Sequence, residues 1–353
     1  MYTPILRNRQ SEILALQRLP SNSKASCTPL LDLAAPTKSD DLATVVTYAE
    51  RNIIRMVKGA KGFAQILVDS SELDPALRLT GNRHPLIEAA RAIEKAGCIP
   101  IPVTGLHRDA AHMNAALKIR KHNGLGTICF RLDSTDVGTA SMSHALLQRL
   151  IATHSLAAKD VIVLIDLQSV HGKDTDSLVL QTSRLIAHMN TTKWAGVIVA
   201  GYGIPDQLSG SISVREQGYI RRIEQDVYLS IVKTYPIDNL WFGDYATLSP
   251  THIELDWRLI SRMMSPKAVY ALRDSWFVVR GGPFSSDAKG YGQYHDLASE
   301  IVALDEFSGS DYSFGDEYID ERTSTSVSPG SPASWIVACV NHHITLTAEA
   351  HLT

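Results

Sequence analysis

The amino-acid sequence predicts a (β/α)8 barrel followed by a smaller α+β appendage. Between Tyr2 and Tyr245, short apolar segments alternate with longer amphipathic ones, and this alternation repeats eight times. Parallel strands joined by covering helices give this order, and eight such units close into a barrel. An open, doubly wound α/β sheet gives nearly the same order and is the alternative. The expected division is residues 1–264 for the barrel and 265–353 for the appendage packed on it.

The expected strands are apolar without strict polar alternation, which is typical of strands buried on both faces. They are Tyr2–Leu6, Thr28–Leu33, Phe63–Val68, Cys98–Val103, Thr127–Leu132, Val161–Leu167, Gly196–Ala200 and Leu240–Asp244. The expected helices carry apolar residues at three- and four-residue spacing, so each has one apolar face to lay on the sheet. They are Asp41–Met56, Pro85–Ala96, Met142–Thr153, Ser177–Met189 and Val214–Val232.

The appendage is predicted to begin with a β-hairpin, because Ala268–Leu272 and Trp276–Arg280 flank a short polar turn. A helix at 293–304 and a Gly-, Ser- and Asp-rich loop at 308–332 follow. The last apolar segment, Trp335–Val340, is interpreted as extended. On a strand, the adjacent His342 and His343 point to opposite faces, so they cannot share a metal ion, and we expect one to be packed and the other exposed.

Composition restricts the class of protein. A formal net charge of −3 and a pI near 6.5 argue against a protein that coats nucleic acid, and the basic cluster ending at His122 is interpreted as a solvated helix end. The four cysteines lack metal-binding or redox spacing and are expected to be buried thiols in a reducing compartment. The N-terminal segment is polar, and no apolar run approaches the about 18 residues of a membrane span. A soluble, cytoplasmic protein without membrane contact is therefore expected.

Charged and polar side chains gather where the predicted strands end, and in a barrel these ends share one mouth. They are Arg7, Arg9, Gln10 and Glu12 after the first strand, Asp32 and Asp69 after the second and third, Arg131 and Asp133 after the fifth, Asp166 after the sixth, and Asp244 and Tyr245 after the eighth. The structural alternative is that such residues only cap the following helices. Arg131 and Asp166 directly abut apolar segments, where an unpaired charge is costly, so we expect them to form a buried pair.

These residues suggest a site for an anionic or polyhydroxylated ligand. Arginines bind anionic oxygens bidentately, and a carboxylate can act as a general base or bind a divalent metal ion. A divalent metal ion is the one cofactor that these residues suggest. The expected catalytic residues are Asp166, Asp244 and Glu12. The expected ligand-binding residues are Arg7, Gln10, Asp32, Arg131, Tyr245, Arg280 and His343. The pair of glycines around Tyr202 could approach a phosphate but is a weak signal, and no established catalytic motif such as HExxH, GxSxG or a P-loop occurs.

Several short blocks resemble, in order and spacing, the beta family, which is named after a tailed-phage beta protein. They include Tyr2-Thr3-Pro4-Ile5-Leu6-Arg7, Pro29-Leu30-Leu31-Asp32, Phe130-Arg131-Leu132, Ile165-Asp166-Leu167, Gly243-Asp244-Tyr245-Ala246, Ser313-Phe314-Gly315-Asp316 and Asn341-His342-His343. The resemblance covers almost the whole chain. It implies a protein of phages, prophages or defence-associated regions of bacterial genomes, and it implies no particular reaction. At Asp32 the relatives more often carry Glu, whose carboxylate lies one methylene further out.

Three functional hypotheses follow. The first is an enzyme that acts at the barrel mouth on a phosphorylated or nucleotide-like ligand, in its most concrete form a metal-assisted phosphoester hydrolase. The second is a non-enzymatic, protein-binding factor in phage–host conflict that uses the aromatic residues of 290–335, although these rings could equally pack the appendage. They are Tyr291, Tyr294, Phe307, Tyr312, Phe314, Tyr318 and Trp335. A nucleic-acid-binding protein is the third and least supported, because the chain has no basic domain.

Overall fold

The computed structural model contains a closed barrel of eight parallel strands, so the predicted (β/α)8 class is confirmed and the open sheet is excluded. The structure describes residues 1–36, 41–189, 193–235, 237, 239–251 and 264–350. The barrel strands are β1 (Tyr2–Arg7), β2 (Leu30–Asp32), β3 (Gln65–Asp69), β4 (Ile99–Gly105), β5 (Ile128–Leu132), β6 (Val161–Ser169), β7 (Gly196–Tyr202) and β9 (Leu240–Asp244). Closure comes from parallel pairing of β1 with β9, where Tyr2 lies beside Phe242.

Each barrel strand is buried on both faces, which explains its continuous apolar sequence. Ile5, Leu67 and Ile101 point into the barrel and pack together there. Leu6 and Val68, one position along their strands, point outward and pack under the helices. The side-chain period of two therefore decides which strand-end residues enter the mouth and which face the surrounding helices.

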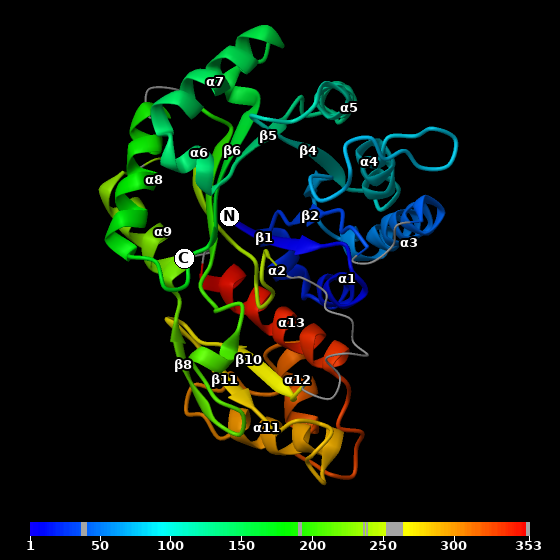
Figure 1. Cartoon of the computed structure of the whole chain (residues 1–353), viewed down its shortest axis with the longest axis vertical. Coiled ribbons are helices and arrows are strands. Elements are labelled where there is room, and N and C mark those ends of the chain that lie inside the picture. The colour runs from blue at the N-terminus through cyan, green and yellow to red at the C-terminus, as the bar shows by residue number, and fades with distance from the viewer. Residues whose placement is uncertain (37–40, 190–192, 236, 238, 252–263, 351–353) are drawn as a thin grey trace.

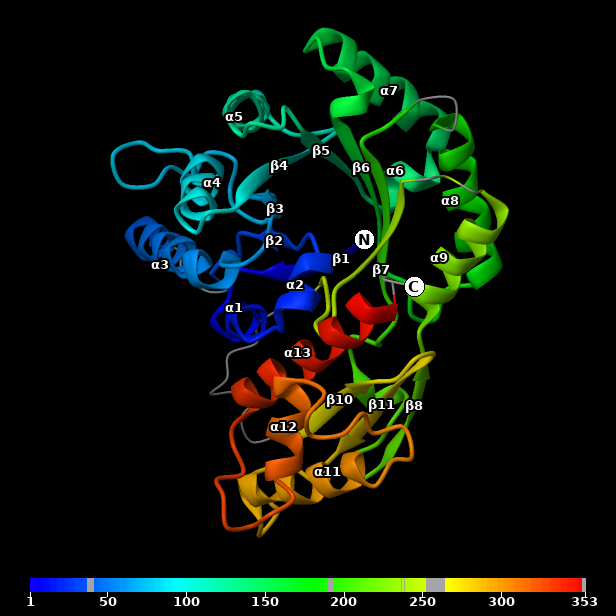
Figure 2. The ribbon, with the colours of Figure 1, turned by 180° about the vertical axis from the view of Figure 1, so that it is seen from behind.

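Helices cover the outside of the barrel (Figures 1 and 2). They are α1 (Gln10–Gln17), α2 (Ser21–Ser26), α3 (Leu42–Ala60), α4 (Pro85–Lys95), α5 (Ala110–His122), α6 (Ser134–Gly138), α7 (Ala140–Thr153), α8 (Thr175–Met189) and α9 (Ile223–Thr234), with 3-10 turns η1 (Ala158–Asp160) and η2 (Leu208–Gly210). The helices expected near 41–56, 85–96, 142–153 and 177–189 are confirmed. Asp41 begins α3 by accepting hydrogen bonds from the backbone N–H groups of Ala43 and Thr44.

A second, three-stranded antiparallel sheet lies below the barrel in Figure 1, in the order β10-β11-β8. The hairpin of β10 (Lys267–Ala271) and β11 (Ser275–Arg280) is as predicted. The helix expected over Val214–Val232 is wrong in its first half, because Gln217–Arg221 forms strand β8 and only Ile223–Thr234 is helical. Pairing of β8 with β11 overrides the local helical pattern, and it brings a segment from within 1–264 into the sheet of the C-terminal part.

The remaining C-terminal elements are η3 (Gly290–Gly292), α11 (Gln293–Val302), α12 (Phe314–Glu321) and α13 (Pro332–Ala350). The extended segment expected at Trp335–Val340 is wrong, because it is the first half of α13. A short apolar run does not by itself distinguish a strand from a buried helix. Helix α13 contacts α1, α2, α12 and β10 and lies between the barrel and the small sheet, so it is apolar on most sides (Figures 1 and 2).

The aromatic residues of 290–335 pack the C-terminal part. Tyr294 and Trp335 stack with ring centroids 4.8 Å apart, and Tyr318 meets Trp335 edge-on. Among these seven rings only Tyr291 is exposed, with 53% of its surface accessible. The described cysteines are free and buried, as expected. No helix in the described ranges is both long and apolar enough to cross a membrane.

Candidate active site at the barrel mouth

Three strand-end aspartates hold the backbone that leaves the barrel. Asp69 and Asp166 each accept a hydrogen bond from the backbone N–H two residues later, at 3.0 Å in both cases. Asp244 does the same at 2.9 Å. Such turns are favoured by aspartate because its short side chain reaches its own backbone. These bonds close local turns and do not cap a helix, and one carboxylate oxygen of each residue is left for another partner.

The backbone after Asp166 is unusual. The pairing of β6 with β7 shifts register between Asp166 and Ser169, and Gln168 has a φ of 56°, in the left-handed region. A bulge of this kind turns side chains away from the regular strand direction, and it is common beside active sites. A non-glycine residue in this conformation costs about 1 kcal/mol or more, so the surrounding contacts must hold it in place.

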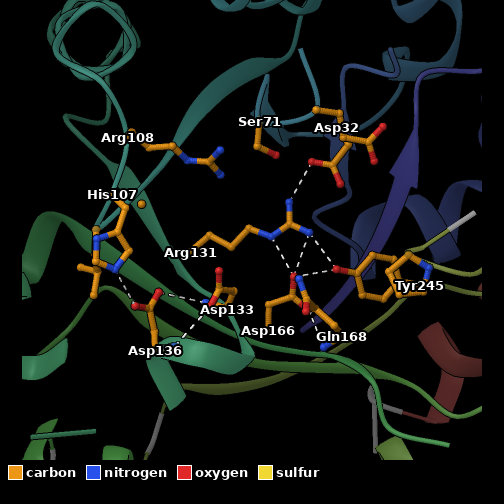
Figure 3. Close-up of a pocket in the computed structure, with 14 residues that line it drawn as sticks. Asp32, Ser71, His107, Arg108, Arg131, Asp133, Asp136, Asp166, Gln168 and Tyr245 are labelled. Carbon is orange, nitrogen blue, oxygen red and sulfur yellow. Dashed lines mark hydrogen bonds and ion pairs between the residues drawn. The ribbon is translucent and has the colours of Figure 1, made fainter. Parts of the chain in front are cut away.

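Arg131 lies at the centre of the mouth, where Figure 3 shows it between Asp32, Asp166 and Tyr245. Its guanidinium binds three carboxylates, those of Asp32, Asp69 and Asp166. Its Nη1 donates to Asp32 Oδ1 at 2.9 Å and to Asp69 Oδ2 at 3.1 Å. Its Nε donates to Asp166 Oδ2 at 2.9 Å. Its Nη2 donates to the Tyr245 hydroxyl at 2.7 Å, and that hydroxyl donates to Asp166 Oδ2 at 2.6 Å. All three nitrogens of Arg131 are therefore engaged within the protein.

The carboxylates of this network differ in protonation. Burial raises the pKa of Asp32 to about 7, although Arg131 acts in the opposite direction. Burial also acts to raise the pKa of Asp69, but the Arg108 and Arg131 guanidinium groups outweigh it and hold that pKa below its usual range. Groups whose environments push their pKa values apart are characteristic of acid–base sites. Asp32 can therefore gain or lose a proton near neutral pH, whereas Asp69 stays ionised.

The network forms one wall of a cavity of about 350 Å³. Arg108 and Arg131 extend into it, and Ser71 and Asp32 also line it, with Asp32 bound to Arg131 (Figure 3). Arg108 donates from Nη2 to Asp69 Oδ2 at 3.0 Å, and no described residue accepts a hydrogen bond from its other guanidinium nitrogens. Gly105 makes room for Arg108, because a Cβ at this position would lie only 3.2 Å from Arg108 Nε. Arg108 is thus the arginine with donors available to a ligand.

Two further predicted residues stand at or behind the rim. Arg7 donates to Glu72 Oε1 at 2.7 Å and to the carbonyl oxygens of Ser249 and Pro250. Glu12 is buried on α1 and accepts a hydrogen bond from the backbone N–H of Arg7 at 2.7 Å. It does not line the cavity. Arg7 and Glu12 therefore fix the course of the chain after β1.

The pH dependence of stability tests this role for Glu12. Burial raises the pKa of Glu12 to about 7, partly opposed by the Arg7 N–H bond. A carboxyl with a raised folded pKa holds its proton longer in the folded state, so the free energy of unfolding falls as pH rises from about 4 to 8. The Glu12→Gln variant should lose less stability between pH 6 and pH 8 than the wild type. Urea unfolding at both pH values measures this, and equal losses in the two proteins would contradict it.

Besides Arg7 and Glu12, four other predicted residues are not part of the cavity lining. Asp244 and His343 meet each other instead, between the barrel and α13, where His343 Nε2 lies 2.8 Å from Asp244 Oδ2. Gln10 lines a surface groove against α12 and α13. Arg280 lines a groove of the C-terminal part and donates to the carbonyl oxygen of Ile212. The structure thus brings together Asp32, Arg131, Asp166 and Tyr245, with Arg7 at the rim.

The adjacent histidines are both fully buried, so the expectation that one is exposed is wrong. Because they lie on a helix, they point in different directions. His342 contacts Asp316 Oδ2 and the carbonyl oxygen of Ala271, both at 2.9 Å, and stacks on Tyr270. They do not share a ligand. Among the residues that the structure describes, no group of three or more His, Cys, Asp or Glu side chains is arranged to hold a metal ion.

Sequence reasoning placed Asp69 at the mouth without giving it a role, and it did not select Ser71 or Arg108. Asp69 directly follows an apolar segment, as Asp166 does, so the signal that predicted burial of Asp166 applies to it as well. Strand β4 extends to Gly105, two residues beyond its expected end at Val103. A strand that ends at Gly105 places Arg108 in the loop that follows it at the mouth. The glycine at this strand end indicates a close approach of the chain to another group.

The fold and the mouth define a (β/α)8-barrel protein whose strand ends gather carboxylates around one buried guanidinium. The chain belongs to the Beta protein family, whose model matches residues 2–349. No curated protein matches it. Among solved structures, a glucosidase from Croceicoccus marinus is similar, at 16% identity and a TM-score of 0.28 over 49% of this chain. The match spans only 41% of that glucosidase and carries no functional argument.

Proposed function

We propose that the barrel mouth is the active site of an acid–base hydrolase for a small phosphorylated ligand. In this proposal Asp32 transfers the proton, Arg108 binds the anionic group, and Arg131 positions Asp32, Asp69 and Asp166. The observation that carries the proposal is that Asp32 and Arg131 line the same cavity as Arg108, whose guanidinium has donors without a described acceptor, and burial raises the pKa of Asp32 to about 7. A general acid–base group is most effective when its pKa lies near the working pH.

The role of Arg131 differs from direct ligand binding. Each of its nitrogens already donates to Asp32, Asp69, Asp166 or Tyr245, so binding an anion would require breaking those bonds. Arg108 carries donors without a described acceptor and is 23% exposed at its side chain, which suits the anchoring of a phosphate. The Ser71 hydroxyl on the cavity wall offers a further hydrogen bond.

The proposed reaction is balanced with one water molecule. The water oxygen bonds to phosphorus as the bond from phosphorus to the leaving oxygen breaks. Protonated Asp32 gives its proton to the leaving oxygen, and the proton lost by the attacking water restores Asp32. Arg108 would balance the negative charge that develops on the phosphoryl oxygens, which is the usual use of arginine in such sites.

Replacement of Asp32 tests the proton-transfer role. With p-nitrophenyl phosphate as the probe, hydrolysis by the wild type should depend on pH with a midpoint near 7, which is the pKa of Asp32. Asp32→Asn should lower the rate about 100-fold or more and abolish that midpoint. An Asp305→Ala control, at an exposed position, should keep the wild-type profile. Hydrolysis by Asp32→Asn at the wild-type rate would contradict the proposal.

We further propose that this activity serves conflict between phage and bacterial host, as the family resemblance implies. The expectation is that expression of the chain changes the plating efficiency of a phage panel on a bacterial host, and that Asp32→Asn removes the change. Equal plating efficiency with the wild type and with Asp32→Asn would mean that hydrolysis at the mouth does not serve such a role. The protein-binding alternative has less support, since nearly all of the aromatic residues proposed for it pack internally.

A further inference from the structure

A second, smaller cavity adjoins the mouth. This satellite pocket has a volume of about 150 Å³ and shares Ser71, His107 and Arg108 with the mouth cavity. Arg108 therefore lies at the junction of two spaces. The remaining lining comes from the segment between β3 and α4 and from the start of α5, namely Ser70, Leu73, Asp74, Pro75, Leu77, His84, Pro85, Asp109 and His112.

The lining of the satellite pocket combines apolar and imidazole side chains with polar ones, among them the carboxylates of Asp74 and Asp109. Leu73 and Leu77 are buried, and the rings of His84 and His112 meet edge-on with centroids 6.1 Å apart. The ring of His112 is fixed by contacts of its two nitrogens with the Ser70 hydroxyl at 3.3 Å and the Val103 carbonyl oxygen at 2.9 Å. His84 Nδ1 accepts the backbone N–H of Leu86 at 3.2 Å. These contacts hold two imidazole rings in defined orientations at a narrow pocket.

His84 is uncharged at neutral pH. Burial, together with the positive charge of Arg78, lowers the pKa of His84 to about 4. A neutral imidazole with one nitrogen engaged presents a flat face, and planar heterocycles stack favourably on such faces. The pocket is therefore better suited to an uncharged planar ring than to a second anion.

We propose that the ligand of this protein is a nucleoside phosphodiester, with its phosphate on Arg108, its base in the satellite pocket and its second, scissile ester, on the side of the phosphate away from the nucleoside, directed into the mouth. Arg108 is held at the junction by its hydrogen bond to Asp69, so an anion on it has the satellite pocket on one side and Asp32 across the mouth cavity on the other. This inference rests on the proposed function and specifies its substrate class.

Calorimetric titration with two probes tests the inference. AMP and ribose 5-phosphate share the phosphate and sugar but differ in the base. Wild-type protein should bind AMP at least about tenfold more tightly, because stacking of one base contributes about this much. Pro75 is an exposed residue of the satellite wall. Pro75→Trp should fill the pocket and reduce AMP affinity to that of ribose 5-phosphate, whereas Ala76→Trp, at an exposed neighbour outside the pocket lining, should change neither affinity.

The two proposals fail in different ways. Equal affinities of AMP and ribose 5-phosphate for the wild type, or unchanged AMP affinity in Pro75→Trp, would overturn the satellite pocket as a base site and leave the phosphate site standing. Arg108→Ala should weaken both probes about tenfold or more, because it removes a charge-assisted contact. Undiminished binding of ribose 5-phosphate to Arg108→Ala, or binding of neither probe to the wild type, would overturn both proposals.

Discussion

Arg131→Ala is expected to reduce the free energy of unfolding by about 3–5 kcal/mol at pH 7, the range for a buried charge network that loses its central partner. The side chains of Asp32 and Asp69 would then face each other and Asp166 without a cation between them, and all three are buried. Protonation relieves this repulsion, so the loss should be smaller at pH 4 than at pH 7. Urea unfolding of both proteins at the two pH values measures the effect.

Arg184→Ala is the matched control, because Arg184 is exposed on α8. Its effect on stability should stay within about 0.5 kcal/mol. Adding Asp166→Asn to Arg131→Ala should recover part of the lost stability, since it removes one of the stranded charges. A loss below about 1 kcal/mol for Arg131→Ala, independent of pH, would mean that the guanidinium does not hold these carboxylates together.

Asp244→Ala is expected to destabilise the protein by about 3 kcal/mol or more while leaving ligand binding at the mouth unchanged. The Asp244 carboxylate accepts a hydrogen bond from the Tyr2 hydroxyl at 2.6 Å and lies 3.4 Å from Arg222 Nη2. It also contacts His343, so it joins the barrel to α13. Truncation would leave the buried Arg222 with one of its two carboxylate partners, Glu224 at 3.3 Å. We therefore assign Asp244 a structural role.

The pH dependence of this effect has a defined sign. Burial acts to raise the pKa of Asp244, but His343, Arg222 and Tyr2 outweigh it and hold that pKa below its usual range. A carboxyl with a lowered folded pKa adds stability above its unfolded pKa of about 4, and the protein loses this stability as pH falls through the folded value. The difference between wild type and Asp244→Ala should therefore shrink in acid. Unchanged stability combined with lost binding of ribose 5-phosphate would contradict the structural role and favour a catalytic one.

The order of barrel elements was predictable because each strand is buried on both faces and each helix on one. The strand Val161–Leu167 and the helix Pro85–Ala96 illustrate the two patterns, and both lie within a residue or two of the observed β6 and α4. The misassigned segments depend on partners distant in sequence. Gln217–Arg221 becomes a strand by pairing with β11, and Trp335–Val340 becomes helical within α13, which is enclosed on several sides.

The buried pair of Arg131 and Asp166 was predictable from the cost of placing charge against apolar strands. Sequence could not show which strand-end carboxylates share the mouth. Asp244 continues the outward-facing series of Leu240 and Phe242 on β9, so it turns to α13. Asp32 and Asp166 continue inward-facing series on their strands. A difference of one residue in strand phase reverses the face to which a side chain points. The positions of His343 and Arg280 also depend on how the C-terminal part packs, which the sequence does not show.

The most direct test of the active-site assignment is a ¹³C NMR titration of the aspartate carboxyl groups, with the Asp32 resonance assigned by its loss in Asp32→Asn. The predicted result is a pKa near 7 for Asp32, because the effect of its burial exceeds the opposing effect of Arg131, and a shift of that resonance when ribose 5-phosphate is added. An Asp32 carboxyl that titrates near its ordinary pKa of about 4 and is unaffected by ribose 5-phosphate would contradict the assignment.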